Sequence, residues 1–147
     1  VYRLTGITMS EHQRRSREKP SPYRLCMIGL TAKNRQVLYD KINRRVDEMM
    51  QKGLLEEARR ILEIPGLRTA YQAIGYKELA GYFNGTCTLE AALEKIKQES
   101  RRYAKRQLTW FRRDERIHWL YLDEQSPEQL VQSAERLIHH NLNTQER

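Results

Sequence analysis

The most regular pattern of apolar and polar positions runs from residue 89 to residue 113. At about 100° per residue the apolar side chains form one stripe, which predicts an amphipathic helix packed on a core. The stripe contains Leu89, Ala92, Leu93, Ile96, Tyr103, Ala104, Trp110 and Phe111. The opposite side carries Lys95, Arg101, Arg102, Lys105, Arg106, Arg112 and Arg113. The segment therefore predicts one long helix with a strongly basic face.

Gln107 interrupts the apolar stripe of this helix. A buried amide without hydrogen-bond partners costs about 1–3 kcal/mol, so this side chain needs a partner. Two interpretations fit it. The amide caps a neighbouring loop, or it reads the edge of an adenine base.

Shorter patterns predict the other elements. The apolar run at residues 23–30 predicts a strand buried on both faces, and the run at 117–122 predicts a second short strand. Further helices are expected at residues 34–52, 54–62, 76–82 and from 127 onward. This order is typical of an α/β protein with helices around a mostly parallel sheet. Because two strands do not form a stable sheet of this kind, further strands are expected before Val1.

Polar residues and glycines mark the ends of the predicted helices. Thr31 or Asn34 can cap the first of them, and Gly53 can end it. Thr88 can cap the long basic helix, and Ser126 can cap the last one.

The first 22 residues differ from the rest of the chain. Residues 1–9 predict the tail of a helix that ends at Thr5 and Gly6, without a start signal before it. Residues 10–22 have the composition of a basic linker or flexible arm. We therefore expect the sequence to be a fragment of a larger protein.

Composition restricts the class of partner. The chain has 147 residues, of which 39% are hydrophobic and 31% charged, and its net charge is +8. One domain with a core is expected, and its partners should be nucleic acid, an anionic surface or phosphorylated ligands. No apolar run approaches the ~20 residues of a membrane span, so no membrane association and a cytoplasmic location are expected. Cys26 and Cys87 lack the spacing of a zinc site.

Two features suggest anion binding. In the helix predicted at 34–52, Arg35 projects into the apolar stripe and Arg45 lies on its flank. A guanidinium on the protein side needs an anion, either a carboxylate of the protein or a ligand phosphate. Gly75 precedes the helix predicted at 76–82, where free backbone N–H groups could receive an anion, although such a glycine is a weak signal alone.

Two long segments carry a family resemblance. YQAIGYKE at 71–78 and RRYAKRQLTWFRRDERIHWL at 101–120 closely resemble the tRNA dimethylallyltransferases, also called tRNA isopentenyltransferases. IGLTAKNRQVLYDKINRRVDEMMQKGLLEEA at 28–58 and VYRLTG at 1–6 are similar to the same family. The resemblance covers nearly the whole chain.

The resemblance implies a P-loop-type, NTPase-like, nucleotide-binding (ATP-binding) fold with a helical insertion. It also implies transfer of a dimethylallyl group from dimethylallyl diphosphate to N6 of the adenosine 3′ of the tRNA anticodon, with Mg²⁺ assisting the leaving group. Residues 1–22 would end the tRNA-binding insertion and its linker, and residues 23–147 would be the C-terminal part of the catalytic α/β domain. The complete enzyme is expected to be a monomer.

The sequence departs from the family pattern in one respect. It contains no Gly-x4-Gly-Lys-Ser/Thr phosphate loop. In the family that loop and an aspartate base lie near the N-terminus, so this chain is expected to be inactive alone, without a catalytic residue or Mg²⁺ ligand of its own.

The resemblance also implies the roles of individual residues. Arg45, and secondarily Arg35, would bind the diphosphate. The anticodon stem-loop of tRNA would contact Gln72, Ala73, Ile74, Gly75, Tyr76, Lys77, Lys105, Arg106, Gln107, Leu108, Thr109, Trp110, Phe111 and Arg112. The alternative function is a non-enzymatic, basic helical RNA-binding module, and a third interpretation makes the basic helix only a solvated face.

Overall fold

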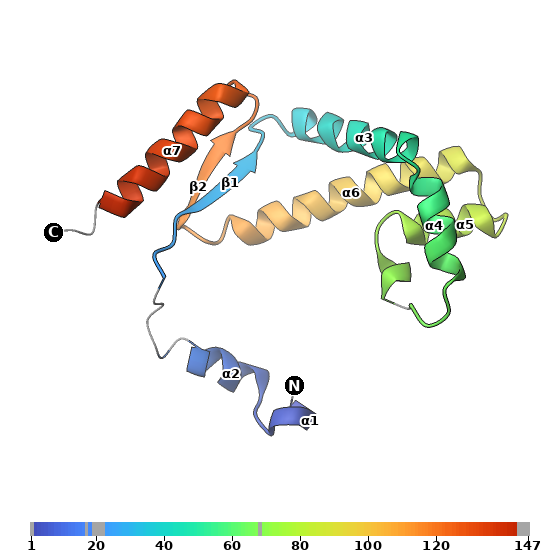
Figure 1. Cartoon of the computed structure of the whole chain (residues 1–147), viewed down its shortest axis with the longest axis horizontal. Helices are drawn as coiled ribbons and strands as arrows, with labels where there is room; N and C mark the ends of the chain where they lie inside the picture. Colours follow the sequence, from blue (N-terminus) through green and yellow to red (C-terminus); the bar gives the residue numbers. More distant parts are fainter. Residues whose placement is uncertain (1, 17, 19–22, 68, 144–147) are drawn as a thin grey trace.

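A computed structural model describes residues 2–16, 18, 23–67 and 69–143. The strands are β1 (Met27–Thr31) and β2 (Ile117–Tyr121). The α-helices are α1 (Tyr2–Thr5), α2 (Met9–Ser16), α3 (Arg35–Gln51), α4 (Leu54–Glu63), α5 (Tyr76–Phe83), α6 (Leu89–Phe111) and α7 (Pro127–Asn143). A short 3₁₀ turn, η1 (Ala70–Gln72), precedes α5. The chain is therefore mostly helical, with one small sheet in the described part (Figure 1).

The two strands pair in parallel, as the sequence predicts. Met27 lies opposite Ile117, and Thr31 lies opposite Tyr121. Helices α3 to α6 form the crossover between them, and α7 packs against β2 (Figure 1). The prediction of a strand buried on both faces is wrong at Leu30, which is 60% exposed because no described element covers that position.

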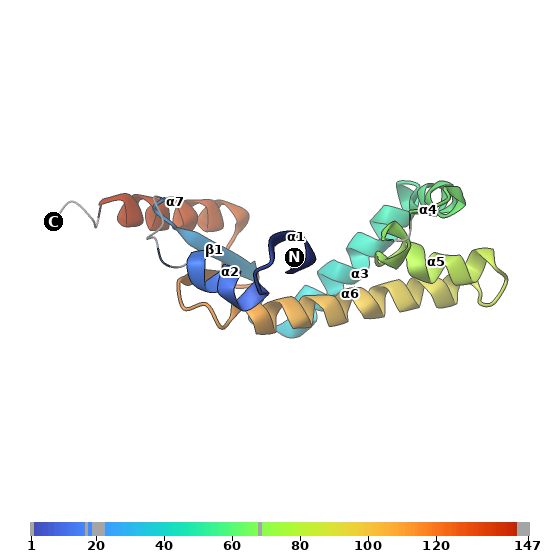
Figure 2. The same cartoon turned by 90° about the horizontal axis from the view of Figure 1, so that it is seen from below.

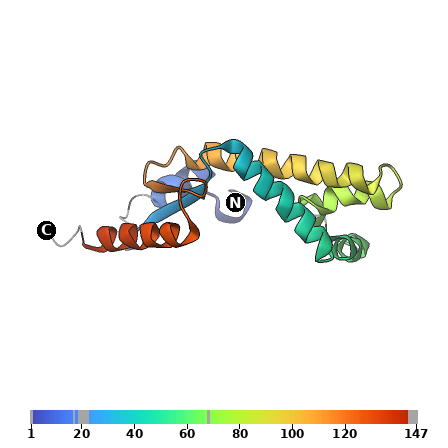
Figure 3. The same ribbon diagram turned by 90° about the horizontal axis from the view of Figure 1, so that it is seen from above.

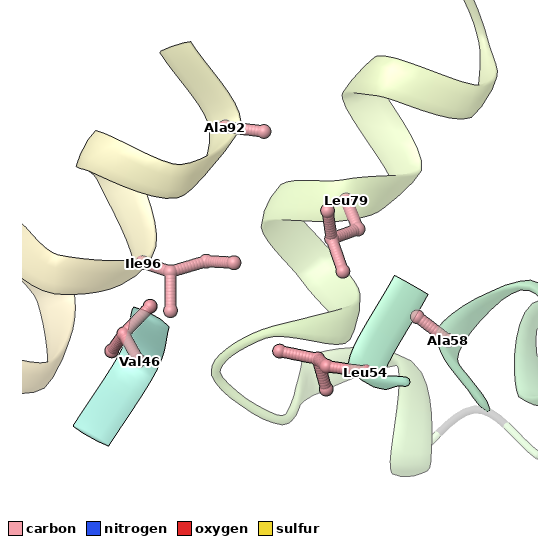
Figure 4. Close-up of a cluster of buried hydrophobic side chains, with 6 residues drawn as sticks. All are labelled: Val46, Leu54, Ala58, Leu79, Ala92 and Ile96. Atoms are coloured by element: carbon pink, nitrogen blue, oxygen red, sulfur yellow. The ribbon is translucent and has the colours of Figure 1, made fainter. Parts of the chain in front are cut away.

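Helices α3 and α6 both run from the sheet toward α4 and α5 and contact each other at an angle, and the molecule is elongated along α6 (Figures 2 and 3). Far from the sheet these four helices enclose a hydrophobic core (Figure 4). Leu79 and Ala58 are completely buried there. The core consists of Val46, Leu54, Ala58, Leu79, Ala92 and Ile96. Leu54 and Ala58, like Ala92 and Ile96, are four residues apart, the spacing that puts two side chains on one helix face.

The predicted helix ends agree with the structure. The Asn34 side chain accepts the N–H of Gln36, and the Thr88 hydroxyl accepts the N–H of Ala91. Gly53 has φ +97°, a left-handed conformation that glycine adopts without strain, and it separates α3 from α4.

The prediction for the apolar stripe of α6 is wrong in its second half. Tyr103, Trp110 and Phe111 are 49%, 68% and 44% exposed. The physical reason is that α6 has two different neighbours. Its first half packs against α3 and α5, whereas its second half turns Ala104 and Leu108 toward the sheet. The last helix, α7, also has exposed apolar side chains, since Val131 and Ile138 are 58% and 43% exposed.

The predicted flexible arm is wrong over residues 10–16, which belong to α2. Glu11 accepts hydrogen bonds from Arg14 and Arg15, and these i,i+3 and i,i+4 pairs support a helix. Residues 17 and 19–22 of the predicted linker lie outside the described residues. Figure 1 shows α1 and α2 apart from the other helices. Within the described ranges, no helix is long and apolar enough to cross a membrane.

Candidate phosphate cleft and RNA interface

A polar cleft of about 450 Å³ lies beside the carboxyl end of β1, between the start of α3 and the end of α6. It is lined by Ala32, Lys33, Arg35, Leu38, Tyr39, Lys105, Leu108, Thr109 and Arg112. Ligands of open α/β sheets bind at the carboxyl ends of parallel strands. The cleft therefore has the position expected of a binding site.

Asp123 holds the backbone that leads into Arg35. Its carboxylate accepts the backbone N–H of Lys33 at 2.9 Å and that of Asn34 at 2.8 Å. The hydrogen bonds from Asn34 and Lys33 lower the pKa of Asp123 below its usual value of 3.8. Because Asp123 follows β2 and Lys33 follows β1, this carboxylate joins the ends of both strands.

The cleft has more cations than anions. Lys33 is paired, with its Nζ 2.6 Å from Glu124 Oε1, and the hydrogen bond to that carboxylate raises the pKa of Lys33. Among the described residues, Arg35, Lys105 and Arg112 make no ion pair. Three cations without a partner favour binding of a multiply charged anion, and guanidinium groups match phosphate geometry.

An apolar cleft of about 460 Å³ adjoins the polar one. It is lined by Met27, Ile28, Gly29, Leu30, Thr31, Leu38, Ala104, Gln107, Leu108, Phe111, Ile117 and Trp119. Leu38 and Leu108 line both clefts and so form their common wall. Gly29 is required here, because a Cβ on it would lie 2.6 Å from Cε3 of Trp119.

Gln107 lies at this apolar cleft. Its side chain is exposed, and in the described part of the chain it makes no hydrogen bond. The structure therefore gives no support to the interpretation that it caps a neighbouring loop.

The two arginines expected at the diphosphate are separated. Arg35 lines the polar cleft, whereas Arg45 is exposed ten residues further along α3 and lines neither cleft described above. Ten residues correspond to about 15 Å of helix. The structure thus brings Arg35, rather than Arg45, together with Lys105 and Arg112.

The segment 72–77 lies near the helical core. Gln72, Ala73, Ile74 and Lys77 are exposed. Gly75 has φ +106°, and its N–H donates to the Glu78 carboxylate at 2.9 Å. The prediction that this N–H is free to bind an anion is therefore wrong, because the carboxylate of Glu78 in the same helix already accepts it.

Tyr76 joins α5 to α4. Its hydroxyl donates a hydrogen bond to Glu57, which raises the pKa of Tyr76 above 10.0. Tyr76 packs against the core that contains Ile96, whereas Gln107 lies eleven residues beyond Ile96 on α6. This corresponds to about 16 Å along the axis of α6. The 72–77 segment therefore lies beside one part of α6, and Gln107 belongs to another part about three turns away.

Sequence reasoning missed several residues that line the clefts. Lys33 and Tyr39 belong to the polar cleft, and Met27 and Trp119 belong to the apolar one. The position of Lys33 just after a predicted strand is a usable signal, since strand ends carry ligand sites. Tyr39 follows Arg35 by four residues, which puts both on one helix face.

The described residues offer no metal site. Nowhere among them do three His, Cys, Asp or Glu side chains gather closely enough to hold an ion. The acids nearest the polar cleft are engaged, Asp123 with backbone N–H groups and Glu124 with Lys33. The residues present therefore do not fit a Mg²⁺ site.

The sequence model of the IPP transferase family matches residues 1–114. The chain belongs to this family. It is 52% identical over 121 residues to the tRNA dimethylallyltransferase of Halalkalibacterium halodurans, an alignment that covers 81% of the chain and 38% of the relative. It is 49% identical over 140 residues to that of Geobacillus thermodenitrificans, which covers 94% of the chain and 43% of the relative.

Solved structures of IPP transferases are similar in fold. The full-length tRNA isopentenylpyrophosphate transferase of Bacillus halodurans matches 96% of the chain with a TM-score of 0.73 and 37% identity. The tRNA delta(2)-isopentenylpyrophosphate transferase of Staphylococcus epidermidis matches 95% of it with a TM-score of 0.67 and 34% identity. The chain spans 50% and 45% of those two structures, and about two fifths of the curated relatives.

Proposed function

We propose that the protein transfers a dimethylallyl group from dimethylallyl diphosphate to N6 of the adenosine 3′ of the anticodon in tRNA. One observation supports this substrate above all: a cationic cleft and an apolar cleft meet at Leu38 and Leu108. An allylic diphosphate has the same two parts, a highly charged end and a hydrocarbon end. Family membership and the names of the relatives agree with it.

The proposed reaction is a displacement at the allylic carbon. The bond from N6 to that carbon forms while the bond from the carbon to the diphosphate oxygen breaks, and the electron pair leaves with the diphosphate. Arg35, Lys105 and Arg112 would bind the diphosphate and stabilise the negative charge that grows on it. The apolar cleft would hold the dimethylallyl group, with the Gln107 amide near the adenine edge.

A proton must leave N6 during this reaction. We assign no described residue as the base that accepts it. The base, the P-loop-type phosphate loop and the ligands of an assisting Mg²⁺ are proposed to come with the remaining length that the relatives have. The complete enzyme would act in the cytoplasm as a monomer.

The RNA would lie along α6. Arg106 would contact RNA phosphates, and Lys105 and Arg112 would lie between these phosphates and the diphosphate. The 72–77 segment would contact the anticodon stem-loop at the other end of the helix. An anticodon loop suits such a surface, because its single-stranded bases can be splayed out of the stack. Arg45 stays a predicted diphosphate ligand for the complete enzyme.

Ligand titration tests the substrate class directly. The 147-residue chain is titrated by calorimetry with dimethylallyl diphosphate, inorganic diphosphate and dimethylallyl alcohol. We expect binding of both diphosphates, tighter binding of the prenylated one, and much weaker binding of the alcohol. Equal affinity for the two diphosphates would contradict a role of the apolar cleft.

A chimera tests the transfer itself. This chain replaces the matching half of the full-length Bacillus halodurans transferase, and radiolabelled dimethylallyl diphosphate is the donor. Label should enter the adenosine 3′ of the anticodon and be lost when the three cleft cations are replaced by Ala. A correctly folded chimera that binds tRNA without transferring label would favour the alternative function, a non-enzymatic RNA-binding module.

A further inference from the structure

We propose that Asp123 is a positioning residue of the polar cleft, which fixes the turn before α3 in the arrangement that lets Arg35 bind a diphosphate. The proposal rests on the proposed function in one respect, the diphosphate as ligand of this cleft. Asp123 lines neither cleft, so it would touch neither the diphosphate nor the prenyl group. It would act on binding through Arg35.

The charge of Asp123 is of the wrong sign for a direct role. Its carboxylate accepts the backbone N–H of Lys33, a residue that lines the polar cleft. An anion in the cleft and a carboxylate beside it repel each other, so on charge alone Asp123 would weaken the binding of a diphosphate. A favourable contribution of Asp123 to binding therefore has to come from geometry.

The backbone between β1 and α3 depends on Asp123. Thr31, the last residue of β1, is buried, and its carbonyl accepts the N–H of Leu122 at 2.8 Å. Beyond this point the chain is exposed, and the N–H groups of Lys33 and Asn34 both donate to Asp123. Within the described ranges these two N–H groups make no other hydrogen bond. The carboxylate is thus the restraint on the turn that leads from the sheet into α3.

The cap of α3 does not replace this restraint. Asn34 is itself the N-cap, since its side-chain oxygen accepts the N–H of Gln36 at 2.9 Å. That bond lies within the first turn of the helix and leaves the helix untied to the sheet. Asp123 follows the end of β2 by two residues and provides the tie. A shift of the turn would move Arg35, the first residue of α3, relative to Lys105 on α6.

Glu124 offers a matched control for charge. Its Oε1 lies 2.6 Å from Nζ of Lys33, so it holds the side chain of Lys33 and not the backbone. Asp123 and Glu124 are adjacent, both are exposed, and each carries one negative charge beside the polar cleft. Removal of either charge has a similar electrostatic effect, whereas only the removal of Asp123 frees the turn.

The test is calorimetric titration of the 147-residue chain with inorganic diphosphate. Asp123→Ala should weaken binding by about 2- to 30-fold, the range expected when a side chain that accepts exposed backbone N–H groups is lost. Asp123→Asn removes the same charge, keeps one accepting oxygen and should also weaken binding. Glu124→Gln should leave the affinity unchanged or raise it, because it removes a repelling charge and frees Lys33. Charge alone would predict tighter binding in all three variants.

A double-variant cycle tests whether Asp123 acts through Arg35. In the background of Arg35→Ala, Asp123→Ala should have little further effect on the affinity, because the guanidinium that the turn positions is already gone. NMR hydrogen exchange reports the turn itself. The amides of Lys33 and Asn34 should exchange faster in Asp123→Ala, while that of Leu79 in the helical core is unchanged. Faster exchange at Leu79 as well would contradict a local role of Asp123.

Three further results would overturn the proposal: equal or tighter binding of inorganic diphosphate by Asp123→Ala, an equal loss in Glu124→Gln, or additive losses with Arg35→Ala. Absence of diphosphate binding by the wild-type chain would also overturn it. Failure of the proposed function gives a different pattern. The wild-type chain would then bind inorganic diphosphate as tightly as dimethylallyl diphosphate, while Asp123→Ala still weakens the binding of inorganic diphosphate.

Discussion

Arg35 and Arg45 lie on the same helix but in different surroundings. The family resemblance implies that both bind the diphosphate, and both lie at or beside the apolar stripe of α3. Only Arg35 follows directly on the strand end that Asp123 fixes, and only Arg35 meets Lys105 and Arg112. Helical periodicity gives the direction of a side chain around the axis but not the neighbours at each level of the helix.

Arg35→Ala should weaken binding of dimethylallyl diphosphate by roughly 10- to 150-fold. The reason is that hydrogen bonds to charged groups are worth about 1.5–3 kcal/mol. Calorimetric titration of the chain measures the change in affinity. Arg44→Ala is the matched control, since Arg44 is an exposed arginine of the same helix that does not line the cleft. An equal reduction in both variants would show only an effect of net charge.

Arg45→Ala tests the remaining prediction for this helix. In the complete enzyme it should raise the apparent KM for dimethylallyl diphosphate much more than that for tRNA, because the guanidinium is predicted to bind the diphosphate. Steady-state kinetics with each substrate varied in turn provides the measurement. An equal effect on both KM values would refute the assigned role.

The pairing of Asp114 with Arg116 predicts how one contribution to stability depends on pH. Its carboxylate accepts hydrogen bonds from the Arg116 guanidinium at 2.8 and 2.7 Å and from the Arg116 N–H at 3.1 Å. These bonds lower the pKa of Asp114 from 3.8 to about 2. Because the pKa is lowered on folding, the stabilisation is complete above about pH 3.8 and is lost as the pH falls through about 2. In Arg116→Gln an NMR titration should find the pKa of Asp114 closer to 3.8, and a value still near 2 would contradict the assignment.

At the scale of single elements, α6 carries most of the chemistry. Its 23 residues extend from the helical core to both clefts. One helix therefore contributes both to the packing of the core and to the lining of the two clefts.

Lys105→Ala combined with Arg106→Ala should weaken tRNA binding and flatten its salt dependence. Removal of one phosphate contact lowers the slope of log affinity against log salt by about 0.7 for single strands and about 0.9 for a duplex treated like B-DNA. Anisotropy measurements at several salt concentrations give this slope. Lys41→Ala with Arg44→Ala removes the same charge from α3 and should leave the slope nearly unchanged. An unaltered slope in the α6 variant would remove both side chains from the RNA interface.

Leu79→Ala should destabilise the helical core by about 2–5 kcal/mol, because a completely buried leucine leaves a cavity when truncated. Urea unfolding followed by circular dichroism gives the change. Val131→Ala is the matched control, since Val131 is 58% exposed and its truncation should cost about 0.5 kcal/mol or less. Similar midpoints for the two variants would contradict the position of Leu79 in the core.

The elements themselves are largely predictable from the sequence. The caps at Asn34 and Thr88 and the parallel pairing are confirmed. The strand at 23–30 is shorter than predicted, because only residues from Met27 onward find a partner in β2. The exposure of Trp110 is not predictable, because periodicity shows that a face is apolar but not what lies against it.

The candidate site is predictable only in parts. The sequence points to Arg35, Lys105 and Arg112 as anion-binding residues. Arg35 and Lys105 are 70 residues apart in the sequence, and they meet in one cleft only because α3 and α6 cross there. The use of the Gly75 N–H by Glu78 is a local contact that a Gly before a helix does not reveal. Such contacts depend on side-chain geometry that no spacing rule encodes.

At the scale of the whole molecule, the sheet with α7 lies at one end and the α4 and α5 helices lie at the other (Figure 1). Among the described elements, α3 and α6 alone connect them, and both helices begin or end at the polar cleft. The position of Lys105 relative to Arg35 therefore depends on how these two helices are held together. One direct tie is the hydrogen bond from Arg101 to Asn43 at 2.6 Å, and another is the ion pair of Lys97 with Asp47 at 2.7 Å.

The hydrophobic core around Leu79 affects which mutations a genetic screen for binding defects would find, although it lies away from both clefts. Apparent affinity falls in proportion to the fraction of molecules that are competent to bind. A screen for weakened diphosphate binding would therefore recover changes at Leu79 or Ile96, which touch no ligand, beside changes at Arg35. Stabilising osmolytes such as trimethylamine oxide would restore diphosphate binding in the variants at Leu79 or Ile96 and leave the variants at Arg35 defective.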